Sequence, residues 1–540
     1  MTRLFILLFS VTLFVSCHRK ATESRPNILL IVADDLGYSD IGCYGGEVRT
    51  PHIDQLAKNG LRFSRFHTAP MCAPTRAMLL SGNNNHVAGM GRQGGVPENS
   101  PMFGKPGYEG HLSDRIIPIP ALLKEAGYHT YIAGKWHLGK KEEDSPFAKG
   151  FERSFTLLQG GGNHFNNMGI ELKDTLSTYR EDGKLVDYPE GEYSTEVYTN
   201  KLMEFIKGDI KDQKPFFAFA AYTSPHWPLQ VPEDYIDRYA GNYDMGYDSL
   251  RVLRFASLKK AGMIANDATL PPRLDFITPW DSLSEAEKKM ESRKMELYAS
   301  MIDNLDHHVG RLIEFLKAEG LYDNTIIIFM SDNGAANNDF YNEDWSKDFL
   351  RSRYENTLEN MGRANSFVSY GPQWAQAGAA PFNRYKSFTT EGGMIAPFII
   401  SGKNIPITGE IKDTYFTVMD LAPTFYELAG ATYPGNLGTP QTRPLLGKSI
   451  LTHLVGGTDF IHDDNYGVGL GHRGHVFYRK GNWKIVQLGG PNVERKMMLF
   501  NLAEDLGETT DLSKVHPEKF ETMLKEWKNY MKENGILLEE

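Results

Sequence analysis

The chain has 540 residues, 41% of them hydrophobic and 12% aromatic, so it can bury a large core and is expected to form roughly two to four domains. A charged fraction of 23% with scattered Gly and Pro excludes wholesale disorder, collagen and coiled coil. The net charge of −10, with no basic run in the folded part, argues against a nucleic-acid-binding role but permits a local cationic pocket for a small anion.

The first residues have the pattern of an export signal. A basic residue precedes an apolar stretch, residues 4–15, that is too short to span a membrane, and Ser16 stands directly before Cys17. We therefore predict a lipoprotein-type signal peptide over residues 1–16 and a lipidated tether over residues 17–25. The predicted location is the periplasm or the outer membrane, with the protein anchored through Cys17. A plain signal peptide with a coincidental cysteine is the alternative.

Four short apolar runs bounded by turn residues alternate with helical patterns. This arrangement predicts an α/β fold with a parallel sheet that is buried on both faces. Because ligands of open α/β sheets bind at the carboxyl ends of the strands, the polar residues that follow these runs are expected in one crevice. The runs are residues 27–33, 130–134, 216–222 and 325–331, and the polar residues are Asp34, Asp35, Lys135, His137, His226, Asp332 and Asn333.

Asp34, Asp35, Asp332 and Asn333 have the side chains of an oxygen-ligated metal site. Three carboxylates that converge in a semi-buried crevice need a compensating cation. Oxygen ligands favour Ca²⁺ or Mg²⁺ over zinc. A single Asp after a strand is commonly only a turn former. Here Asp-Asp and Asp-Asn-Gly both follow predicted buried strands, which favours the metal site.

Basic side chains are expected around the same crevice. Together with a metal they would form a site for a small, highly charged oxyanion. Any one of them alone is more simply a surface charge. The candidates are Arg76, Lys135, His137, His226 and Lys386.

Cys72 opens a predicted helix. Pro74 suits the first turn and Gly82 suits the end. The cysteine then lies at a helix N-terminus, where free N–H groups and the helix dipole favour anions. An ordinary thiolate nucleophile is one option, although no protease-like cysteine signature surrounds Cys72. Cys43, the other cysteine of the predicted mature chain, lies among small residues and is interpreted as a buried, inert thiol.

These motifs resemble those of the type I sulfatases of the alkaline phosphatase superfamily, most closely the bacterial arylsulfatases. Residues 72–76, CAPTR, are similar to the maturation motif in which the cysteine is oxidised to formylglycine. Residues 127–137, GYHTYIAGKWH, are similar to the second signature of the family. Residues 26–35, 331–334 and 386–393 match in the same order, so the resemblance covers nearly the whole chain from Pro26 to about residue 512.

The resemblance implies a mixed, mostly parallel central sheet flanked by helices and a smaller C-terminal α+β domain with an antiparallel sheet and a helix. It implies Ca²⁺ held by Asp34, Asp35, Asp332, Asn333 and modified Cys72. It further implies sulfate ester hydrolysis by a formylglycine hydrate, after maturation by a formylglycine-generating enzyme. Lys386 and His226 would hold the sulfate and assist the leaving oxygen, His137 would act as a base, and Arg76 and Lys135 would hold the modified residue.

The substrate is expected to be an aryl sulfate or a sulfated carbohydrate, and the sequence does not distinguish them. Trp227, Trp374, Asn163 and His164 are candidates for the substrate rim, the last two on a glycine-rich loop that is interpreted as mobile. Two other functions remain open: a phosphodiester or phosphonate monoester hydrolase on the same scaffold, and a catalytically silent lipoprotein that binds sulfated glycans.

The predicted domains are a catalytic domain over residues 26–450 and a C-terminal subdomain over residues 451–540. The second contains a hairpin over residues 476–486 and a final helix over residues 517–534. His307 and His308 are not a metal pair, because neighbouring residues of a helix point about 100° apart. They fall in an amphipathic helix that a capping box, Ser284 to Glu287, precedes.

Overall fold

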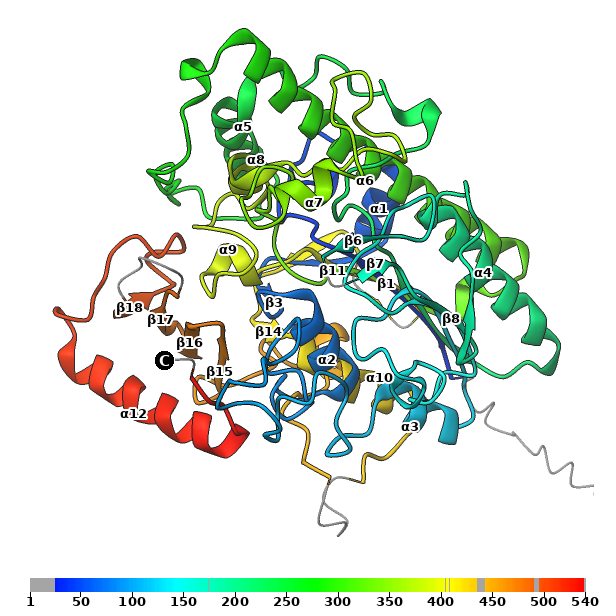
Figure 1. Ribbon diagram of the computed structural model, residues 1–540. Coiled ribbons are helices and arrows are strands. Elements are labelled where there is room, and N and C mark those ends of the chain that lie inside the picture. The colour runs from blue at the N-terminus through cyan, green and yellow to red at the C-terminus, as the bar shows by residue number, and fades with distance from the viewer. Residues whose placement is uncertain are drawn as a thin grey trace, which may run out of the picture.

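The computed structural model describes residues 25–538 except 173, 404, 407, 435–441 and 490–494 (Figure 1). The predicted signal peptide and Cys17 lie outside the described residues. None of the helices in the described part of the chain combines the length and the hydropathy that spanning a bilayer requires.

Within the described residues, ten strands form one mixed sheet. Its centre is parallel, and the predicted strands β11, β1, β10 and β4 are direct neighbours there, with β5 beside β4. Antiparallel pairs extend the sheet on both sides. In spatial order the strands are β13 (Glu410–Lys412), β2 (Gly60–Phe63), β12 (Phe398–Gly402), β11 (Thr325–Ser331), β1 (Asn27–Ala33), β10 (Phe216–Ala221), β4 (His129–Lys135), β5 (Arg153–Leu157), β8 (Tyr179–Glu181) and β9 (Lys184–Val186).

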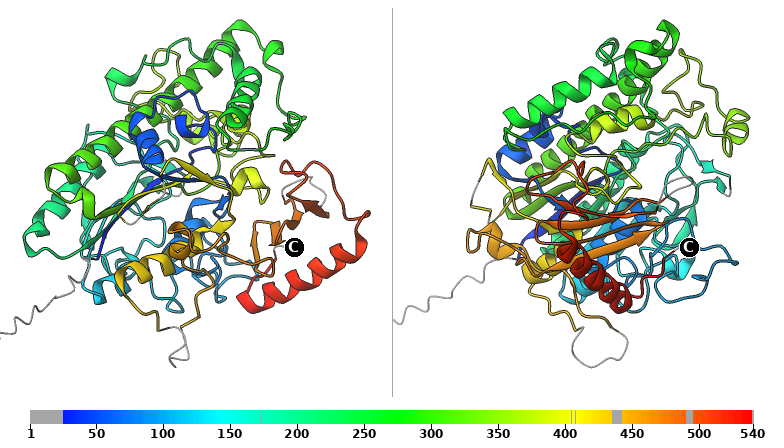
Figure 2. Two further views of the ribbon diagram at one scale, coloured as in Figure 1. Left: turned by 180° about the vertical axis from the view of Figure 1, so that it is seen from behind. Right: turned by 90° about the vertical axis from the view of Figure 1, so that its left-hand side faces the viewer.

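Helices cover both faces of this sheet, as the two views of Figure 2 show. Alternate residues of β1 belong to two hydrophobic cores: Leu29 and Ile31 lie in one, and Ile28 and Leu30 lie in the other. This double burial explains why the strand is a continuous apolar run. The first core includes residues of α1 (Pro51–Lys58), α4 (Ser194–Asp209), α5 (Gly246–Lys260), α6 (Glu285–Ala318) and α8 (Gly371–Gly378), and the second includes residues of α2 (Cys72–Ser81), α3 (Ile119–Glu125), α10 (Leu421–Ala429) and α11 (Leu451–Leu454).

Helix α6 begins with the predicted capping box, in which Ser284 and Glu287 bond each other's backbone N–H groups. His308 is buried in this helix, and His307 stacks edge-on against it. Cys43, predicted to be buried, lies half-buried in a short 3-10 turn, and burial raises its thiol pKa well above the ordinary value. These residues are structural.

A second, antiparallel sheet lies near the C-terminus, as the resemblance implies. It consists of β15 (Gly467–His472), β16 (His475–Lys480), β17 (Trp483–Gln487) and β18 (Met497–Asn501), and β16 and β17 form the predicted hairpin. Helix α12 (Pro517–Asn534) has the predicted bounds and places Trp527 on this sheet. The division at residue 450 stays a prediction. The remaining elements are β3 (Phe66–His67), β6 (Met168–Glu171), β7 (Asp174–Leu176), β14 (Phe416–Thr417), α7 (Lys347–Arg351) and α9 (Glu391–Met394).

Candidate functional site

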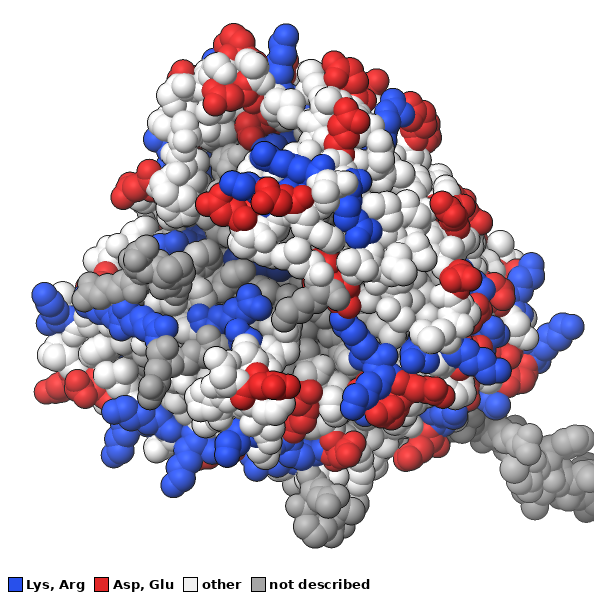
Figure 3. All heavy atoms as spheres, viewed as in Figure 1, with Lys and Arg blue, Asp and Glu red and all other residues white. Residues whose placement is uncertain are grey.

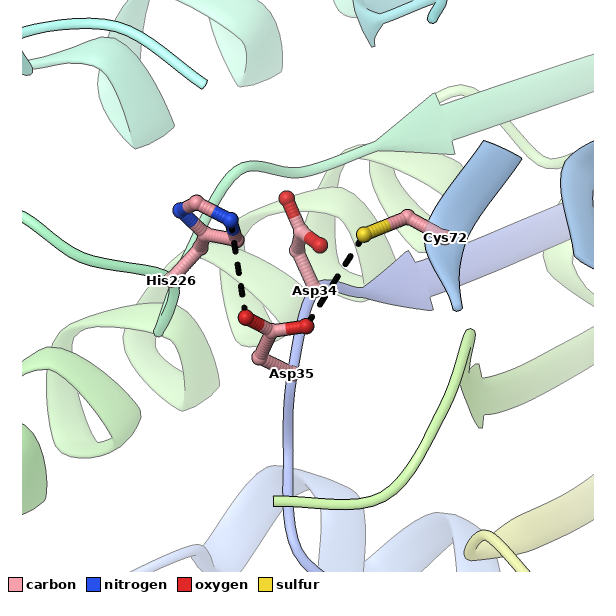
Figure 4. A group of neighbouring side chains, drawn as sticks. All are labelled: Asp34, Asp35, Cys72 and His226. Carbon is pink, nitrogen blue, oxygen red and sulfur yellow. Dashed lines mark hydrogen bonds and ion pairs between the residues drawn. The ribbon is translucent and has the colours of Figure 1, made fainter. Parts of the chain in front are cut away.

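The four central strands deliver their polar residues to one place. Asp34 and Asp35 follow β1, Asp332 follows β11, His226 follows β10, and Lys135 ends β4. One ligand atom from each of Asp34, Asp35, Cys72 and His226 lies within 4.8 Å of the other three (Figure 4). The crevice predicted from the strand ends therefore exists, and Cys72 reaches it from the N-terminus of α2.

Asp332 and Asn333 belong to the same group. The backbone N–H of Asp35 donates to Asp332 Oδ1 at 3.3 Å, and Asn333 Nδ2 donates to Asp35 Oδ1 at 2.7 Å. Asp35 has a left-handed backbone, with φ at +68°, which is uncommon for a residue other than glycine. All of these side chains are buried. Residues from two separate strand ends thus form one compact acidic centre.

Each carboxylate of this centre is paired with a buried cation. Lys135 Nζ lies 2.9 and 2.7 Å from the two oxygens of Asp34. Lys386 Nζ lies 2.5 and 2.7 Å from those of Asp35. Arg76 donates twice to Asp332 Oδ2, at 3.0 and 2.8 Å. Three positive groups therefore balance three carboxylates, so the expectation that a metal is needed to neutralise them does not follow from charge alone.

Other observations fit a cation. Burial raises the pKa of Asp34 to about 7 against the opposing effect of Lys135, and the neighbouring Asp332 and Asp35 contribute to this rise. Burial also acts to raise the pKa of Asp35, but Lys386 and His226 outweigh it and hold the value at about 2. Asn333 Oδ1 is buried and has no hydrogen-bond partner among the described residues. An unpaired amide oxygen beside carboxylates is a donor set that suits a hard divalent ion.

Cys72 lies beside the ion pair of Asp35 and Lys386. Its Sγ is 3.9 Å from Asp35 Oδ1 and 3.3 Å from Lys386 Nζ. Burial raises the pKa of the thiol to about 12, more than Lys135 and Lys386 can offset. Gly82 ends the helix in the left-handed region, as predicted. A protonated thiol is a poor nucleophile, so the unmodified side chain is not suited to a thiolate mechanism.

His226 and His137 differ in their hydrogen bonds. His226 Nδ1 donates to the Trp227 carbonyl at 2.5 Å, which leaves Nε2 facing Asp35 Oδ2 at 3.5 Å. His137 Nδ1 is buried without a partner in the described part of the chain. Burial, followed by the nearby Lys135 and Arg76, lowers the pKa of His137 well below its ordinary value. His137 is therefore neutral near pH 7 and can accept a proton.

A pocket of about 940 Å³ opens above this centre, and His137, His226 and Lys386 are among its lining residues. Figure 3 shows the face on which it opens, with basic side chains gathered on the side of the C-terminal sheet. Arg473, from the turn between β15 and β16, lines the pocket, so the C-terminal sheet contributes to its wall.

Of the four predicted rim residues, only Trp227 lines the pocket. Asn163 and His164 are buried, because Asn163 Nδ2 bonds the Ala364 carbonyl and His164 Nδ1 bonds Ser194. Trp374 is fully buried and packs against Tyr243, Tyr247 and Trp280. The prediction was wrong for these three residues, and the glycine-rich loop is packed into the fold.

The sequence did not point to the segment that lines the pocket in place of these three residues. Asn338, Phe340, Glu343 and Trp345 line the pocket from the loop after the Asp332 motif. The one signal that could have drawn attention to this loop is its position directly after a strand that ends in the site.

Comparison with known proteins identifies the family. The Sulfatase family model matches residues 26–431. The chain is 41% identical over 540 residues to an uncharacterized sulfatase of Schizosaccharomyces pombe, covering 96% of each chain. It is 40% identical to an arylsulfatase of Klebsiella aerogenes, covering 80% of this chain and 92% of that one.

This chain belongs to the sulfatase family. It is a sulfuric ester hydrolase, and the alkaline phosphatase-like architecture follows from its similarity to solved sulfatases. One is a crystal structure described as Ps i-CgsB in complex with k-i-k-neocarrahexaose, with a TM-score of 0.68, 25% identity and coverage of 95% of this chain and 94% of that one. A phosphonate monoester hydrolase of Agrobacterium radiobacter shares the fold at 17% identity, with a TM-score of 0.57 and coverage of 94% and 96%.

Proposed function

We propose that this sulfatase hydrolyses sulfate monoesters with residue 72 as nucleophile, after a formylglycine-generating enzyme has converted Cys72 to an aldehyde that is hydrated in the active enzyme. The observation that carries this proposal is the position of Cys72, whose sulfur lies beside the acidic centre and 3.3 Å from Lys386 Nζ. A thiol with a pKa raised to about 12 is a poor nucleophile, whereas a hydrated aldehyde offers a hydroxyl group at the same point.

Asp34, Asp35, Asp332 and Asn333, with an oxygen of modified residue 72, would hold a divalent cation, for which Ca²⁺ is the best fit. The unpaired Asn333 Oδ1 and the surrounding carboxylate oxygens support this assignment. When bound, the ion supplies Lewis-acid stabilisation of the negative charge on the sulfate oxygens.

Lys386 and His226 would act on the sulfate group. Lys386 contacts both Asp35 and the sulfur of Cys72, so its ammonium group is within reach of a sulfate oxygen. His226 lies on the other side of Asp35 and would assist the departing oxygen together with Lys386. Positive charge fixed at this point stabilises the charge that develops as the ester bond breaks.

His137, Arg76 and Lys135 would act on residue 72 or on the carboxylates around it. Neutral His137 would accept a proton from the second hydroxyl group, so that the aldehyde re-forms and sulfate leaves. Arg76 is tied to Asp332 and to the Lys135 carbonyl, and Lys135 is tied to Asp34. These contacts hold the acidic centre and offset its charge.

The experiment uses protein produced together with a formylglycine-generating enzyme. Mass spectrometry of the Cys72 peptide is expected to show the loss of mass that converts the thiol to an aldehyde. The matured protein is expected to release sulfate from 4-nitrophenyl sulfate much faster than it cleaves bis(4-nitrophenyl) phosphate. The reverse preference would establish a phosphodiesterase, and glycan binding without any turnover would establish a silent lectin-like protein.

We also propose export and lipidation at Cys17. Its support is the sequence pattern before Cys17, since residues 1–24 lie outside the described structure. Labelling with a fatty acid in a bacterial host is expected for the wild type and not for Cys17→Ser. Labelling of both proteins, or of neither, would contradict lipidation at this residue.

A further inference from the structure

Aromatic side chains lead from the acidic centre around Asp34, Asp35 and Cys72, called the sulfate centre from here on, to the mouth of the pocket. The ring of His226 lies 4.2 Å from that of Trp227, Trp227 lies 4.7 Å from Phe340, and Phe340 lies 5.0 Å from Trp345, measured between centroids. Trp227, Phe340 and Trp345, here called the aromatic wall, all line the pocket. Exposure rises along the wall from 9% at Trp227 to 59% at Trp345.

Hydrogen bonds hold the aromatic wall in place. Trp345 Nε1 donates to Glu343 Oε2 at 2.6 Å, and Trp227 Nε1 donates to Asn338 Oδ1 at 3.2 Å. Ser346 Oγ donates to the Phe340 carbonyl at 2.6 Å. A single exposed tryptophan on a protein surface needs no explanation. One that is fixed at a pocket mouth, in a continuous line with a catalytic histidine, presents a ready-made apolar face to a substrate.

The rest of the pocket lining mixes apolar residues, among them Met71, Leu158 and Ile170, with polar ones. It includes Lys140 and Asp174, which form an ion pair, and Gln159, Glu171 and Arg473. A volume of about 940 Å³ lies at the upper end of the range for small-molecule sites, so the pocket exceeds the needs of one sulfated ring. An aryl leaving group uses an apolar wall but not these carboxylate, amide and guanidinium groups. A chain of sugars uses both.

We propose that the substrate is a sulfated oligosaccharide and that Trp345 is a specificity-determining residue, on which the sugar beyond the sulfated one stacks. The proposal rests on the proposed sulfatase function of the same site. The C–H bonds of a pyranose face are apolar and slightly positive, so they pack well on the negative face of an indole ring. The hydroxyl groups at the sugar edges bond the polar lining.

The test compares substrates that do and do not reach Trp345. Matured wild type and Trp345→Ala are assayed on 4-nitrophenyl sulfate and on sulfated hexasaccharide fractions from carrageenan, chondroitin sulfate and heparin. For the hexasaccharide that wild type cleaves best, kcat/KM is expected to fall about tenfold in Trp345→Ala, while that for 4-nitrophenyl sulfate stays within about twofold. Trp345→Phe, which keeps a ring, is expected to recover most of the loss.

Phe460→Ala is the matched control, because Phe460 is 60% exposed and does not line the pocket; it is expected to change neither activity. Three results would overturn the proposal. Trp345→Ala could lose kcat/KM equally on both substrates, or it could lose none on the hexasaccharide. The wild type could also cleave 4-nitrophenyl sulfate but none of the hexasaccharides. If no sulfate ester is cleaved, the proposed function fails instead. Calorimetric binding of the hexasaccharides to Cys72→Ala, with and without Trp345→Ala, then tests Trp345 separately, and equal affinities would overturn its role.

Discussion

Two buried clusters of charge lie in this protein, and they differ in what surrounds them. The first is the sulfate centre around Asp34, Asp35 and Cys72. The second joins α9 to the C-terminal sheet, and we call it the junction cluster: Lys484 Nζ lies 2.6 Å from Glu391 Oε1 and 2.8 Å from Glu508 Oε1. Its other members are His67, which bonds Glu391 at 2.8 Å, and Arg479.

The comparison teaches that buried charge by itself does not mark an active site. None of the residues of the junction cluster lines the pocket, and Glu508 even bonds the backbone N–H of Glu391 at 2.6 Å. The sulfate centre instead opens on the pocket. Asn333 Oδ1 and His137 Nδ1 have no hydrogen-bond partner among the described residues, and neither has Glu508 Oε1 of the junction cluster, but Glu508 Oε1 still faces Lys484 Nζ at 2.8 Å. A charged cluster that opens on a pocket is placed to act on a ligand, whereas a closed network of ion pairs holds the fold together.

The largest expected effect is a loss of activity with little change in stability. Cys72→Ala removes the group that becomes the nucleophile, so kcat/KM for 4-nitrophenyl sulfate is expected to fall by about 10⁴-fold or more. Thermal unfolding is expected to shift little, because the thiol makes only long contacts with Asp35 and Lys386. Activity within about tenfold of wild type in this variant would contradict the assigned nucleophile.

Metal removal tests the acidic centre directly. Ca²⁺ at 100 times its dissociation constant is expected to stabilise the wild type by about 2.7 kcal/mol, and a chelator is expected to abolish both this gain and the activity. Asp34→Ala is expected to lose the response to Ca²⁺, since it removes one of the four converging ligand atoms. Glu508→Gln, in the junction cluster, serves as the control and is expected to respond like wild type. A melting temperature independent of Ca²⁺ in matured wild type would argue against the metal site.

Lys484→Met breaks the junction cluster. It removes the lysine that pairs with two buried carboxylates, so the free energy of unfolding is expected to drop by about 3–5 kcal/mol, measured by urea denaturation. Lys480→Met is the matched control: its ion pair with Glu526 is partly exposed and is expected to contribute less than about 1 kcal/mol. The folded fraction of Lys484→Met is expected to keep kcat within about tenfold of wild type, and a larger loss would make the junction cluster part of the catalytic machinery.

The smallest expected effect concerns Glu508. Burial raises the pKa of its carboxyl group to about 7 against the opposing effect of Lys484, and the neighbouring Glu391 contributes to this rise. The folded protein therefore binds this proton more tightly than the unfolded chain, in which a glutamate has a pKa of about 4.3. The stability that this proton supplies is present below the unfolded value and is lost as the pH rises toward 7.

Glu508→Gln has no such proton. Relative to wild type, the variant is expected to gain about 2 kcal/mol of stability between pH 4.5 and pH 7, measured by urea unfolding at both values. Asp511→Asn is the comparison for a carboxylate whose pKa is lowered, to about 2; Asp511 accepts a hydrogen bond from the backbone of Leu499 in β18, and the variant is expected to show no gain over this range. A constant difference between wild type and Glu508→Gln would show that Glu508 is ionised throughout.

The sequence by itself determined the elements that depend on neighbours along the chain. The apolar runs that became β1 and β11, the helix from Cys72 to Gly82 and the helix from Pro517 to Asn534 depend on periodicity, capping residues and turn residues. The grouping of Asp34 with Asp332 also followed, because parallel strands present their carboxyl ends at one edge of a sheet.

Only the tertiary structure decided which side chains reach the pocket and which cation pairs with which carboxylate. Asn163 and Trp374 looked accessible as single residues, yet packing against distant segments buries them. Trp345 had no motif, yet the path of its loop places it at the mouth. The physical reason is that local propensities and patterns act between near neighbours in the sequence, whereas burial and ion pairing depend on loops that are brought together only when the whole sheet has formed.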